Sequence, residues 1–426
     1  MSTALLGIDI GSTNVKSIII SPTGKVLALA KIPTRNFAHL DKKGQCTLSA
    51  CVAQLCKEVT EKAPNCTIKA MAISCVGSGG IFLDENDTKF LLPKIEKNLD
   101  PVPHISEKDF IDTCGYPRQG AGAGYTLAML MAEQPEQAKK VKTFLSVGDY
   151  VNFVLTGVKK REISTASSLT FRDKLKGEDW KDFIAASKID LAILPPVCQS
   201  GEFIGHLTPN AAKLCGLPQD TPVFAGGHDY LCGAFAAGCA KEGDVINVLG
   251  TYEMTGAFFS KPKKDFYNPN FFCFMDNHTY PGSFAVTTEH LGVRYIQEYY
   301  PELNTGELTL EQRFIQLDKN PNSQETLKKA LTEMNEKSVK AIEYLRGVTG
   351  NTPLCIKVIG GGSHSRYWLQ SKANAIGATL TVPRITEASA TGAALLAGCG
   401  AGVFTNYHEA LHLYDGVATD YFQPEF

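Results

Sequence analysis

Two features near the N-terminus could do chemistry: a carboxylate at the end of an apolar strand, and a turn rich in hydroxyl groups. Residues 5–20 predict two strands joined by a tight turn that contains Gly11, Ser12 and Thr13, with Asp9 at the end of the first strand. Glycine adopts backbone angles closed to other residues, and the hydroxyls and turn amides can donate hydrogen bonds to phosphate oxygens. Asp9 would then hold Mg²⁺ through the waters of the ion. An ordinary hairpin with a polar tip has the same composition, so the rest of the chain must decide.

The same pattern of strand, small-residue turn and strand recurs in the second half of the chain. Residues 243–257 place Gly250 and Thr251 between two apolar strands. This repeat predicts two related lobes that close on one nucleotide, with a boundary that divides the chain into residues 1–225 and 226–426.

A third glycine-rich turn follows a buried strand at residues 356–365. It contains Gly361, Gly362 and Ser365 and leads into a predicted helix. Bare backbone at the start of a helix lets a flat group such as adenine, or an α-phosphate, approach the main chain.

The segments between these turns predict an α/β protein. Apolar residues at helical spacing predict a helix over 48–62, and the apolar run 68–74 predicts a buried strand. Two helices are expected within 126–157, and single helices are expected over 210–215, 231–238, 367–376 and 388–401. A strand, a hairpin, a helix and a further strand in this order form an α/β layer.

The composition indicates a globular protein with neither a nucleic acid nor a membrane as partner. The chain has 426 residues, of which 44% are hydrophobic, and this is enough for full cores in two or three domains. A formal net charge of -2 gives no positive field to attract a nucleic acid. The sequence has neither the pattern of a leader peptide nor an apolar run of membrane-spanning length, which predicts a cytoplasmic protein.

The 13 cysteines are scattered, and none forms a Cys-x-x-Cys pair or a Cys/His cluster with zinc-ligand spacing. Cys46, Cys51 and Cys56 recur at a spacing that turns each one away from a shared helix face. Buried, reduced thiols are therefore expected.

Taken in order, these segments resemble the FGGY family of carbohydrate kinases, within the superfamily of hexokinase, actin and the heat-shock chaperone ATPases. The resemblance runs nearly end to end and includes residues 7–13, 149–150, 155–157, 194–197, 226–229, 250–251, 360–365 and 392–394. Each motif alone is weak evidence for the family, but all of them together in this order are strong evidence. The resemblance implies two ribonuclease H-like lobes of the actin/hexokinase type around a central nucleotide cleft.

The resemblance also implies roles for single residues. Asp229 corresponds to the catalytic base, and Asp9 corresponds to the carboxylate near Mg²⁺. Phosphoryl transfer needs a carboxylate to orient and deprotonate the attacking hydroxyl, and a metal to neutralise charge between the β- and γ-phosphates. Gly226 and Gly227 leave room for a substrate beside Asp229, whose alternative role is the N-cap of the next helix. The expected ATP-binding residues are Gly11, Ser12, Thr13, Lys16, Gly250, Thr251, Gly361, Gly362 and Ser365.

The implied activity is ATP-dependent phosphorylation of a hydroxyl group of a sugar, polyol or sugar acid, with ATP and Mg²⁺ as cofactors. Lys16 is expected to contact phosphate, but an exposed strand lysine without a role in binding is an equally good interpretation. A homodimer is compatible with this interpretation.

The acceptor side departs from the family pattern. Members commonly carry a Gln or His motif where this chain has residues 74–80, and a Trp-x-Asp-x-Arg motif where it has residues near 96–100. A pocket rebuilt with Lys97 would suit an acidic or phosphorylated sugar, because lysine favours an anion; a solvated surface lysine is the alternative. The expected substrate-binding residues are Ser78, Lys97, Asn98 and Tyr230.

Three other functions compete with a kinase. A nucleotide-gated binding or regulatory protein on the same fold would have lost phosphoryl transfer, and the retention of Asp9 and Asp229 argues against it. A dinucleotide-binding oxidoreductase is suggested by residues 120–124, but no predicted strand directly precedes them. A serine hydrolase lacks its Gly-x-Ser-x-Gly elbow after a strand.

Overall fold

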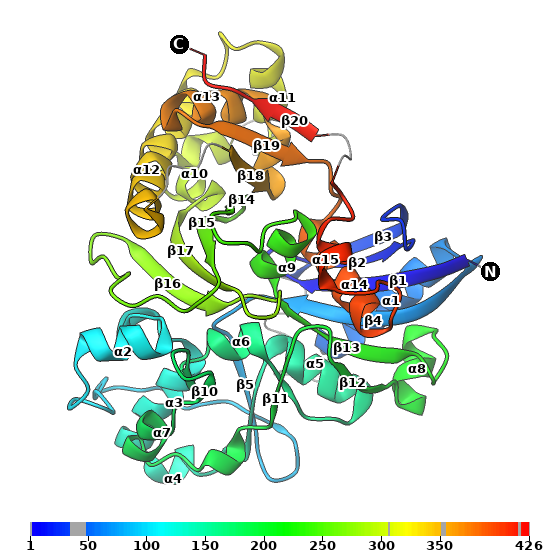
Figure 1. Cartoon of the computed structure of the whole chain (residues 1–426), viewed down its shortest axis with the longest axis vertical. Coiled ribbons are helices and arrows are strands. Elements are labelled where there is room, and N and C mark those ends of the chain that lie inside the picture. Colours follow the sequence, from blue (N-terminus) through cyan, green and yellow to red (C-terminus); the bar gives the residue numbers. More distant parts are fainter. Residues whose placement is uncertain (1, 35–47, 306, 351–354, 416–418, 426) are drawn as a thin grey trace.

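The computed structural model describes residues 2–34, 48–305, 307–350, 355–415 and 419–425, and shows two large sheets with helices packed around them (Figure 1). Both sheets are built around parallel central strands that continue into an antiparallel hairpin. The α/β class and the two-lobed architecture expected from the sequence are confirmed.

The first sheet has the strand order β12-β13-β4-β1-β2-β3. Its strands are β1 (Ser2–Ile10), β2 (Asn14–Ile20), β3 (Val26–Pro33), β4 (Cys66–Cys75), β12 (Phe203–His206) and β13 (Pro222–His228). The predicted hairpin is present, because β1 pairs antiparallel with β2 from Leu5↔Ile20 to Ile10↔Val15. β1 and β13 both run parallel to β4, so Asp9, the penultimate residue of β1, and Asp229, directly after β13, lie at the same edge of the sheet.

The second sheet has the order β16-β17-β15-β14-β18-β19-β20. Its strands are β14 (Val245–Leu249), β15 (Tyr252–Phe259), β16 (Phe272–Asn277), β17 (Phe284–Leu291), β18 (Cys355–Ile359), β19 (Thr379–Pro383) and β20 (Thr419–Phe422). The hairpin β14–β15 runs antiparallel, and β14 runs parallel to β18, as β1 does to β4. The same succession of hairpin, parallel neighbour and antiparallel edge strand thus occurs in both sheets.

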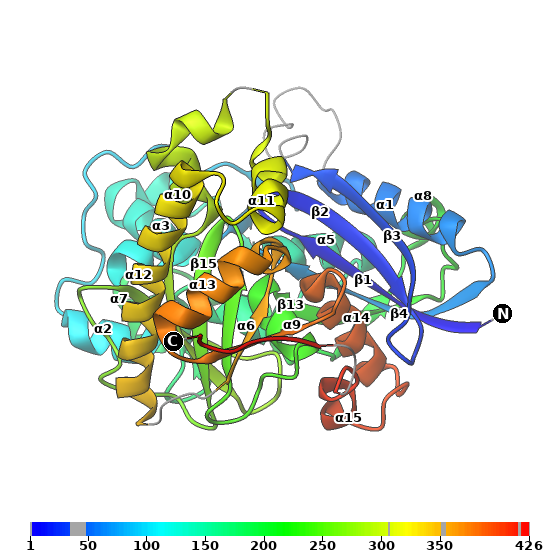
Figure 2. The same cartoon turned by 90° about the horizontal axis from the view of Figure 1, so that it is seen from above.

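Helices cover both faces of each sheet. Figure 2 shows α1 (Leu48–Lys62) and α8 (Pro209–Cys215) on one side of the first sheet, with α14 (Ala388–Gly400) and α15 (Tyr407–Leu411) on the other. On the second sheet, α12 (Glu325–Thr349) packs against β15 and β17, and α13 (Arg366–Ile376) packs against β19. The helices α10 (Val293–Tyr299) and α11 (Leu310–Lys319) complete this side.

Helix α14 comes from the end of the chain yet packs against β1 and β4 of the first sheet. The approach is close, since a Cβ on Gly7 would collide with the carbonyl oxygen of Ala390, and a Cβ on Gly392 would collide with the carbonyl of Cys232 in α9 (Asp229–Ala236). Small residues along α14 therefore let two helices and a sheet meet with little space between them. The predicted lobe boundary after residue 225 falls within β13.

The segment between β4 and β12 forms a layer of its own at the bottom of Figure 1. It holds a small sheet of β5 (Gly80–Leu83), β6 (Lys89–Phe90) and β7 (Thr143–Ser146). Its helices are α2 (Glu107–Cys114), α3 (Gly122–Glu133), α4 (Pro135–Ala138), α6 (Ile163–Ser167) and α7 (Lys181–Ala186), whereas α5 (Val147–Thr156) of the same segment packs on the first sheet against β4, β12 and β13. Two short strand pairs also belong to it: β8 (Arg161–Glu162) with β11 (Val197–Cys198), and β9 (Arg172–Asp173) with β10 (Glu178–Asp179).

Most of the predicted elements are confirmed, and one expectation is incomplete. Residues 126–157 contain the strand β7 between helices, not two helices alone. Residues 120–124 follow a 3₁₀ helix and not a strand, which agrees with the rejection of a dinucleotide site. Cys51 and Cys56 are buried and form no disulfide with the described residues, whereas Cys46 lies outside the described residues. Among the described helices, none is both long and apolar enough to cross a membrane.

Candidate active site

The two predicted phosphate-binding turns meet each other across the two sheets. The hydroxyls of Thr13, between β1 and β2, and Thr251, between β14 and β15, lie 3.1 Å apart. Each turn is fixed by its own backbone: the Gly11 amide donates to the carbonyl of Asn14 (3.1 Å), and the Gly250 amide donates to the carbonyl of Tyr252 (3.1 Å). Hydroxyl groups from both halves of the chain therefore point at one place.

Asp9 lies directly behind the first turn and is 4% exposed. Its Oδ1 accepts a hydrogen bond from Ser74 (3.0 Å), and its Oδ2 is 3.9 Å from the ammonium of Lys16. Burial, with the negative charge of Asp229 as a second cause, raises the pKa of Asp9 to about 7. The negative charge of ionised Asp9 is therefore not fully balanced by the groups around it.

Asp229 is the first residue of α9 and is half-buried. Its Oδ1 accepts from the backbone amide of Tyr230 (2.7 Å) and lies 3.6 Å from Nε2 of His228. Burial raises the pKa of Asp229, while the positive charges of His228 and Lys16 lower it. The N-cap residue of α9 is His228 and not Asp229, so capping of the helix does not use both carboxylate oxygens of Asp229.

Lys16 is not an exposed strand lysine. Its ammonium forms an ion pair with Glu387 (2.7 Å), which precedes α14 in a left-handed conformation with φ 47°. The strand that carries the first turn is thereby joined to the last long helix of the chain.

The third glycine turn begins the 3₁₀ helix η6 (Gly361–His364), which leads into α13. Gly361 is exposed, and a Cβ placed on it would meet no heavy atom within 4 Å. Gly362 packs closely on the Trp368 ring, and Ser365 is buried, accepts from the Trp368 amide (3.3 Å) and donates to Asp318 (3.0 Å). Gly361 thus offers open backbone, whereas the Ser365 hydroxyl is used to start the helix.

Tyr230 lies under Asp229 but is 2% exposed. Its hydroxyl donates to Asp276 (3.3 Å) and lies 3.3 Å from Thr287. Asp276 also accepts from Tyr116 (2.8 Å) and pairs with the fully buried Lys174 (3.4 Å). This cluster was not predicted from the sequence, although a lone aspartate in the apolar run 271–276 indicates a buried polar contact.

His228 connects this cluster to Asp229. Its Nδ1 is 3.6 Å from Asp276, and its Nε2 is 3.6 Å from Asp229. Burial opposes its charge, but its interaction with Asp276 and the charge of Asp229 together raise the pKa of His228. The ring fills the space left by Gly77, because a Cβ on Gly77 would collide with it.

The remaining predicted acceptor residues lie apart from one another. Ser78 adopts φ 57° beside His228, and its amide donates to Ser168 (3.2 Å). Lys97 and Asn98 are exposed in the loop between β6 and α2, where the Lys97 amide donates to Glu133 at the end of α3 (2.8 Å). No contact among the described residues joins Lys97 or Asn98 to Asp229, and their substrate role stays a prediction.

A buried ion pair lies behind the second turn. Glu253, two residues after Thr251, pairs with Lys372 of α13 at 2.6 Å, and both side chains are 0% exposed. Ser338 of α12 and Asn247 of β14 also donate to Glu253 (2.7 and 3.0 Å). This pair ties the hairpin β14–β15 to the helix that follows the third glycine turn.

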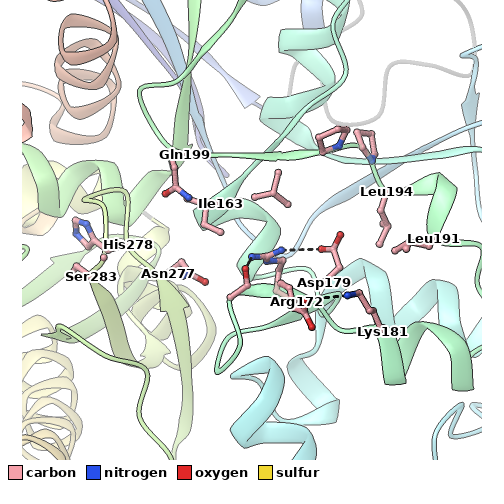
Figure 3. Close-up of a pocket in the computed structure, with 16 residues that line it drawn as sticks. Ile163, Arg172, Asp179, Lys181, Leu191, Leu194, Gln199, Asn277, His278 and Ser283 are labelled. Carbon is pink, nitrogen blue, oxygen red and sulfur yellow. Dashed lines mark hydrogen bonds and ion pairs between the residues drawn. The ribbon is translucent and has the colours of Figure 1, made fainter.

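Figure 3 shows a groove of about 650 Å³ that contains none of the predicted site residues. It is lined by segments from both halves of the chain, including Arg172, Asp179, Asn277 and His278. Its main charged groups are already paired, as in Arg172–Asp179 (3.2 Å). The chemistry of Asp9 and Asp229 lies elsewhere.

Comparison with known proteins identifies the family. The model of the N-terminal domain of the FGGY family of carbohydrate kinases matches residues 4–236, and the model of the C-terminal domain matches residues 324–401. The chain belongs to the FGGY family of carbohydrate kinases. It is therefore an ATP-dependent carbohydrate kinase, and the other functions considered above have no support.

Named relatives of this FGGY chain act on several sugars. It is 24% identical to the xylulose kinase of Bacillus subtilis (strain 168), covering 95% of this chain and 90% of the relative. It is 25% identical to the L-fuculokinase of Escherichia coli (strain K12) over 59% of this chain and 55% of that enzyme.

Solved structures show the same fold. The ligand-bound xylulose kinase and the gluconate kinase of Lactobacillus acidophilus both give a TM-score of 0.82, at 16% and 15% identity. These comparisons cover 99% and 100% of this chain, and 94% of each of the two structures.

Within the described residues, no three His, Cys, Asp or Glu side chains are grouped to hold a metal ion directly. Mg²⁺ in kinases is commonly bound by one or two carboxylates together with water and substrate phosphates. The unbalanced charge at Asp9 fits an ion held in that way.

Proposed function

We propose that this kinase transfers the γ-phosphoryl group of ATP to a hydroxyl of a small carbohydrate acceptor held beside Asp229. The observation that carries the proposal is the contact of the Thr13 and Thr251 turns in front of two carboxylates, Asp9 and Asp229, whose charges act on each other. A phosphate clamp and a proton acceptor are the two parts that such a transfer requires.

Each half of the chain contributes to the binding of the nucleotide. Ser12 and Thr13 from the first half, and Gly250 and Thr251 from the second, would donate hydrogen bonds to phosphate oxygens. The open backbone at Gly361 would lie against the base or the α-phosphate. Residues 1–225 and 226–426 would form the two lobes that close on the nucleotide.

Asp229 would orient the acceptor hydroxyl and accept its proton. A general base works best when its pKa lies near the operating pH, and burial raises the pKa of Asp229 in that direction. His228 limits the rise, because its positive charge favours the ionised form of Asp229.

Asp9 would hold Mg²⁺ through water, and the ion would supply neutralisation of charge between the β- and γ-phosphates. Ser74 fixes Oδ1 of Asp9 by a hydrogen bond of 3.0 Å. Lys16 is 3.9 Å from Oδ2 of Asp9 and is paired more closely with Glu387 at 2.7 Å, so the Asp9 carboxylate can still bind a cation. A cytoplasmic location and a homodimer stay predictions from the sequence.

The test is acceptor-dependent release of ADP, measured by a coupled assay with ketoses, polyols and aldonates. The Asp229→Asn variant is expected to lose about 100-fold or more in kcat, the usual effect of removing a general base. Its affinity for ATP, measured by calorimetry, is expected to stay near that of the wild type. The exposed Asp182 of α7 offers a matched control, Asp182→Asn. Turnover that survives in Asp229→Asn while ATP binding collapses would refute the assigned role.

A further inference from the structure

Strand β17 presents two opposite faces, and their contacts show which residues point toward Asp229. His290 lies 3.9 Å from the buried Glu253, so these two neighbours face the helices behind the sheet. Side chains alternate along a strand, and Thr287 and Glu289 therefore face the other way. The hydroxyl of Thr287 is 3.3 Å from that of Tyr230, which confirms that this second face lies against α9.

Glu289 occupies this face between apolar neighbours. It stands opposite Met254 on one side and opposite Phe272 on the other, so these three side chains share the face. Phe272 is 38% exposed, and its ring packs against Gly120 of the first half, where a Cβ would collide with it. A carboxylate and a partly exposed aromatic ring thus lie side by side on the sheet face that contacts α9, the helix that begins at Asp229.

The carboxylate of Glu289 has no assigned role within the protein. It forms no side-chain hydrogen bond and no ion pair with the described residues. Burial raises the pKa of Glu289, the charge of His228 lowers it, and the charge of Asp229 raises it further. A largely buried carboxylate that interacts with the catalytic pair but has no partner is available to a ligand.

The charges around this position disfavour an anionic ligand. Lys16 and His228 are the described cations whose charges act on Asp229, and each is already opposed by carboxylates: Lys16 by Glu387 at 2.7 Å, and His228 by Asp276 and Asp229 at 3.6 Å each. Lys97, the cation from which an acidic acceptor was predicted, is exposed on another loop. A carboxylate on the acceptor would therefore meet Glu289 and Asp229 without a free cation among the described residues.

We propose that Glu289 and Phe272 form an acceptor subsite that selects neutral polyhydroxy compounds over sugar acids. The inference rests on the proposed function, because it places the acceptor beside Asp229. Glu289 accepts hydrogen bonds from one or two acceptor hydroxyls, and the Phe272 ring covers the C–H face of the acceptor. Hydroxyl donors and a carboxylate acceptor form the stronger, charge-assisted class of hydrogen bond.

The test compares acceptors of equal carbon number: xylitol with xylonate, and sorbitol with gluconate. For the wild type, kcat/KM for the polyol is expected to exceed that for the aldonate by at least about tenfold, from repulsion between like charges. Glu289→Gln is expected to raise the KM for the polyol by about tenfold while leaving the KM for ATP unchanged. Glu289→Lys is expected to shift the preference toward the aldonate, an effect that loss of folding cannot mimic. Glu58→Gln on α1, where the glutamate is 42% exposed, is the matched control.

Aldonate preference in the wild type, or an unchanged ratio in both Glu289 variants, would overturn the inference. Calorimetry of the same pairs, with a non-hydrolysable ATP analogue bound, separates this from failure of the proposed function. If no acceptor releases ADP and the polyols still bind more tightly than the aldonates, the transfer role fails and the subsite stands. If transfer occurs but both assays favour the aldonates, the subsite assignment alone fails.

Discussion

Replacing Lys372 by methionine tests whether the buried ion pair behind the second turn stabilises the fold. Lys372 and Glu253 lie 2.6 Å apart and are both 0% exposed. At an effective dielectric constant of about 20, their attraction is roughly 6 kcal/mol, against a desolvation cost of several kcal/mol for each ion. Lys372→Met leaves Glu253 buried without its cation, so we expect a loss of about 3 to 5 kcal/mol in the free energy of unfolding.

The loss should depend on pH with a defined sign. In the wild type, burial raises the pKa of Glu253, but the charges of Lys372 and His290 and the hydrogen bonds from Lys372 and Ser338 together hold it below its ordinary value. Its ionised form therefore contributes stability above the ordinary pKa and loses it as the pH falls. In Lys372→Met, burial without the cation raises the pKa of Glu253, so the variant should be weakest above neutral pH and should recover toward about pH 5.

The measurement is urea unfolding followed by tryptophan fluorescence. Trp368 is one of two tryptophans, and its ring centre lies 5.7 Å from the Lys372 ammonium, so its emission reports on this region. The double variant Lys372→Met/Glu253→Gln removes both charges and should regain most of the lost stability. As a control, Lys139→Met breaks an exposed pair with Glu136 of similar length (2.7 Å) and should cost less than about 1 kcal/mol.

Additive losses in the double variant would refute this reasoning. So would a Lys372→Met cost as small as that of Lys139→Met. In either case the pair would contribute through packing alone and not through the burial of opposed charges.

Three further predictions concern the active site. Burial holds the pKa of Asp9 at about 7, so the metal-free wild type should lose stability as the pH rises from about 4 to 7, and Asp9→Asn should lose less. Urea unfolding in EDTA at about pH 5 and about pH 8 measures the change in the free energy of unfolding for each protein. An equal change in the two proteins would contradict the prediction. Asp9→Asn should also abolish the extra rise in melting temperature that Mg²⁺ adds to ADP, and a retained Mg²⁺ effect would place the ion elsewhere. Gly77→Ala should lower kcat by about tenfold or more, because the new methyl group displaces the His228 ring, and unchanged kinetics would show that the ring position does not matter.

The strands, turns and helices that form the site could be predicted from the sequence because they depend on local patterns. The helix over 48–62 and the hairpin at residues 5–20 follow from apolar spacing and a short turn, and both are observed. The meeting of Thr13 with Thr251 follows from a repeat that recurs at one position in each half. Such features require no knowledge of which distant side chains pack together.

The acceptor side depends on long-range packing and could not be predicted in this way. Glu289 and Asp276 are single acidic residues in apolar strands, and the strand register places both on the face that contacts α9. Only the packing of distant segments shows that Asp276 is buried with Lys174 while Glu289 is partly exposed. Lys97 was predicted as an acceptor residue from its place in the motif order, and the loop that carries it is joined to the end of α3 by the hydrogen bond from the Lys97 amide to Glu133. A spacing in the sequence does not determine where such a loop lies.

The position of α14 has a consequence for how the protein is made. Its residues leave the ribosome long after those of β1 and β4, yet they pack against the sheet that these two strands form. Before α14 is synthesised, the apolar side chains of β1 and β4 that it buries remain exposed. The N-terminal half is then prone to aggregation unless a chaperone binds it. A nonsense mutation near residue 385 would therefore damage the N-terminal half as severely as the truncated end.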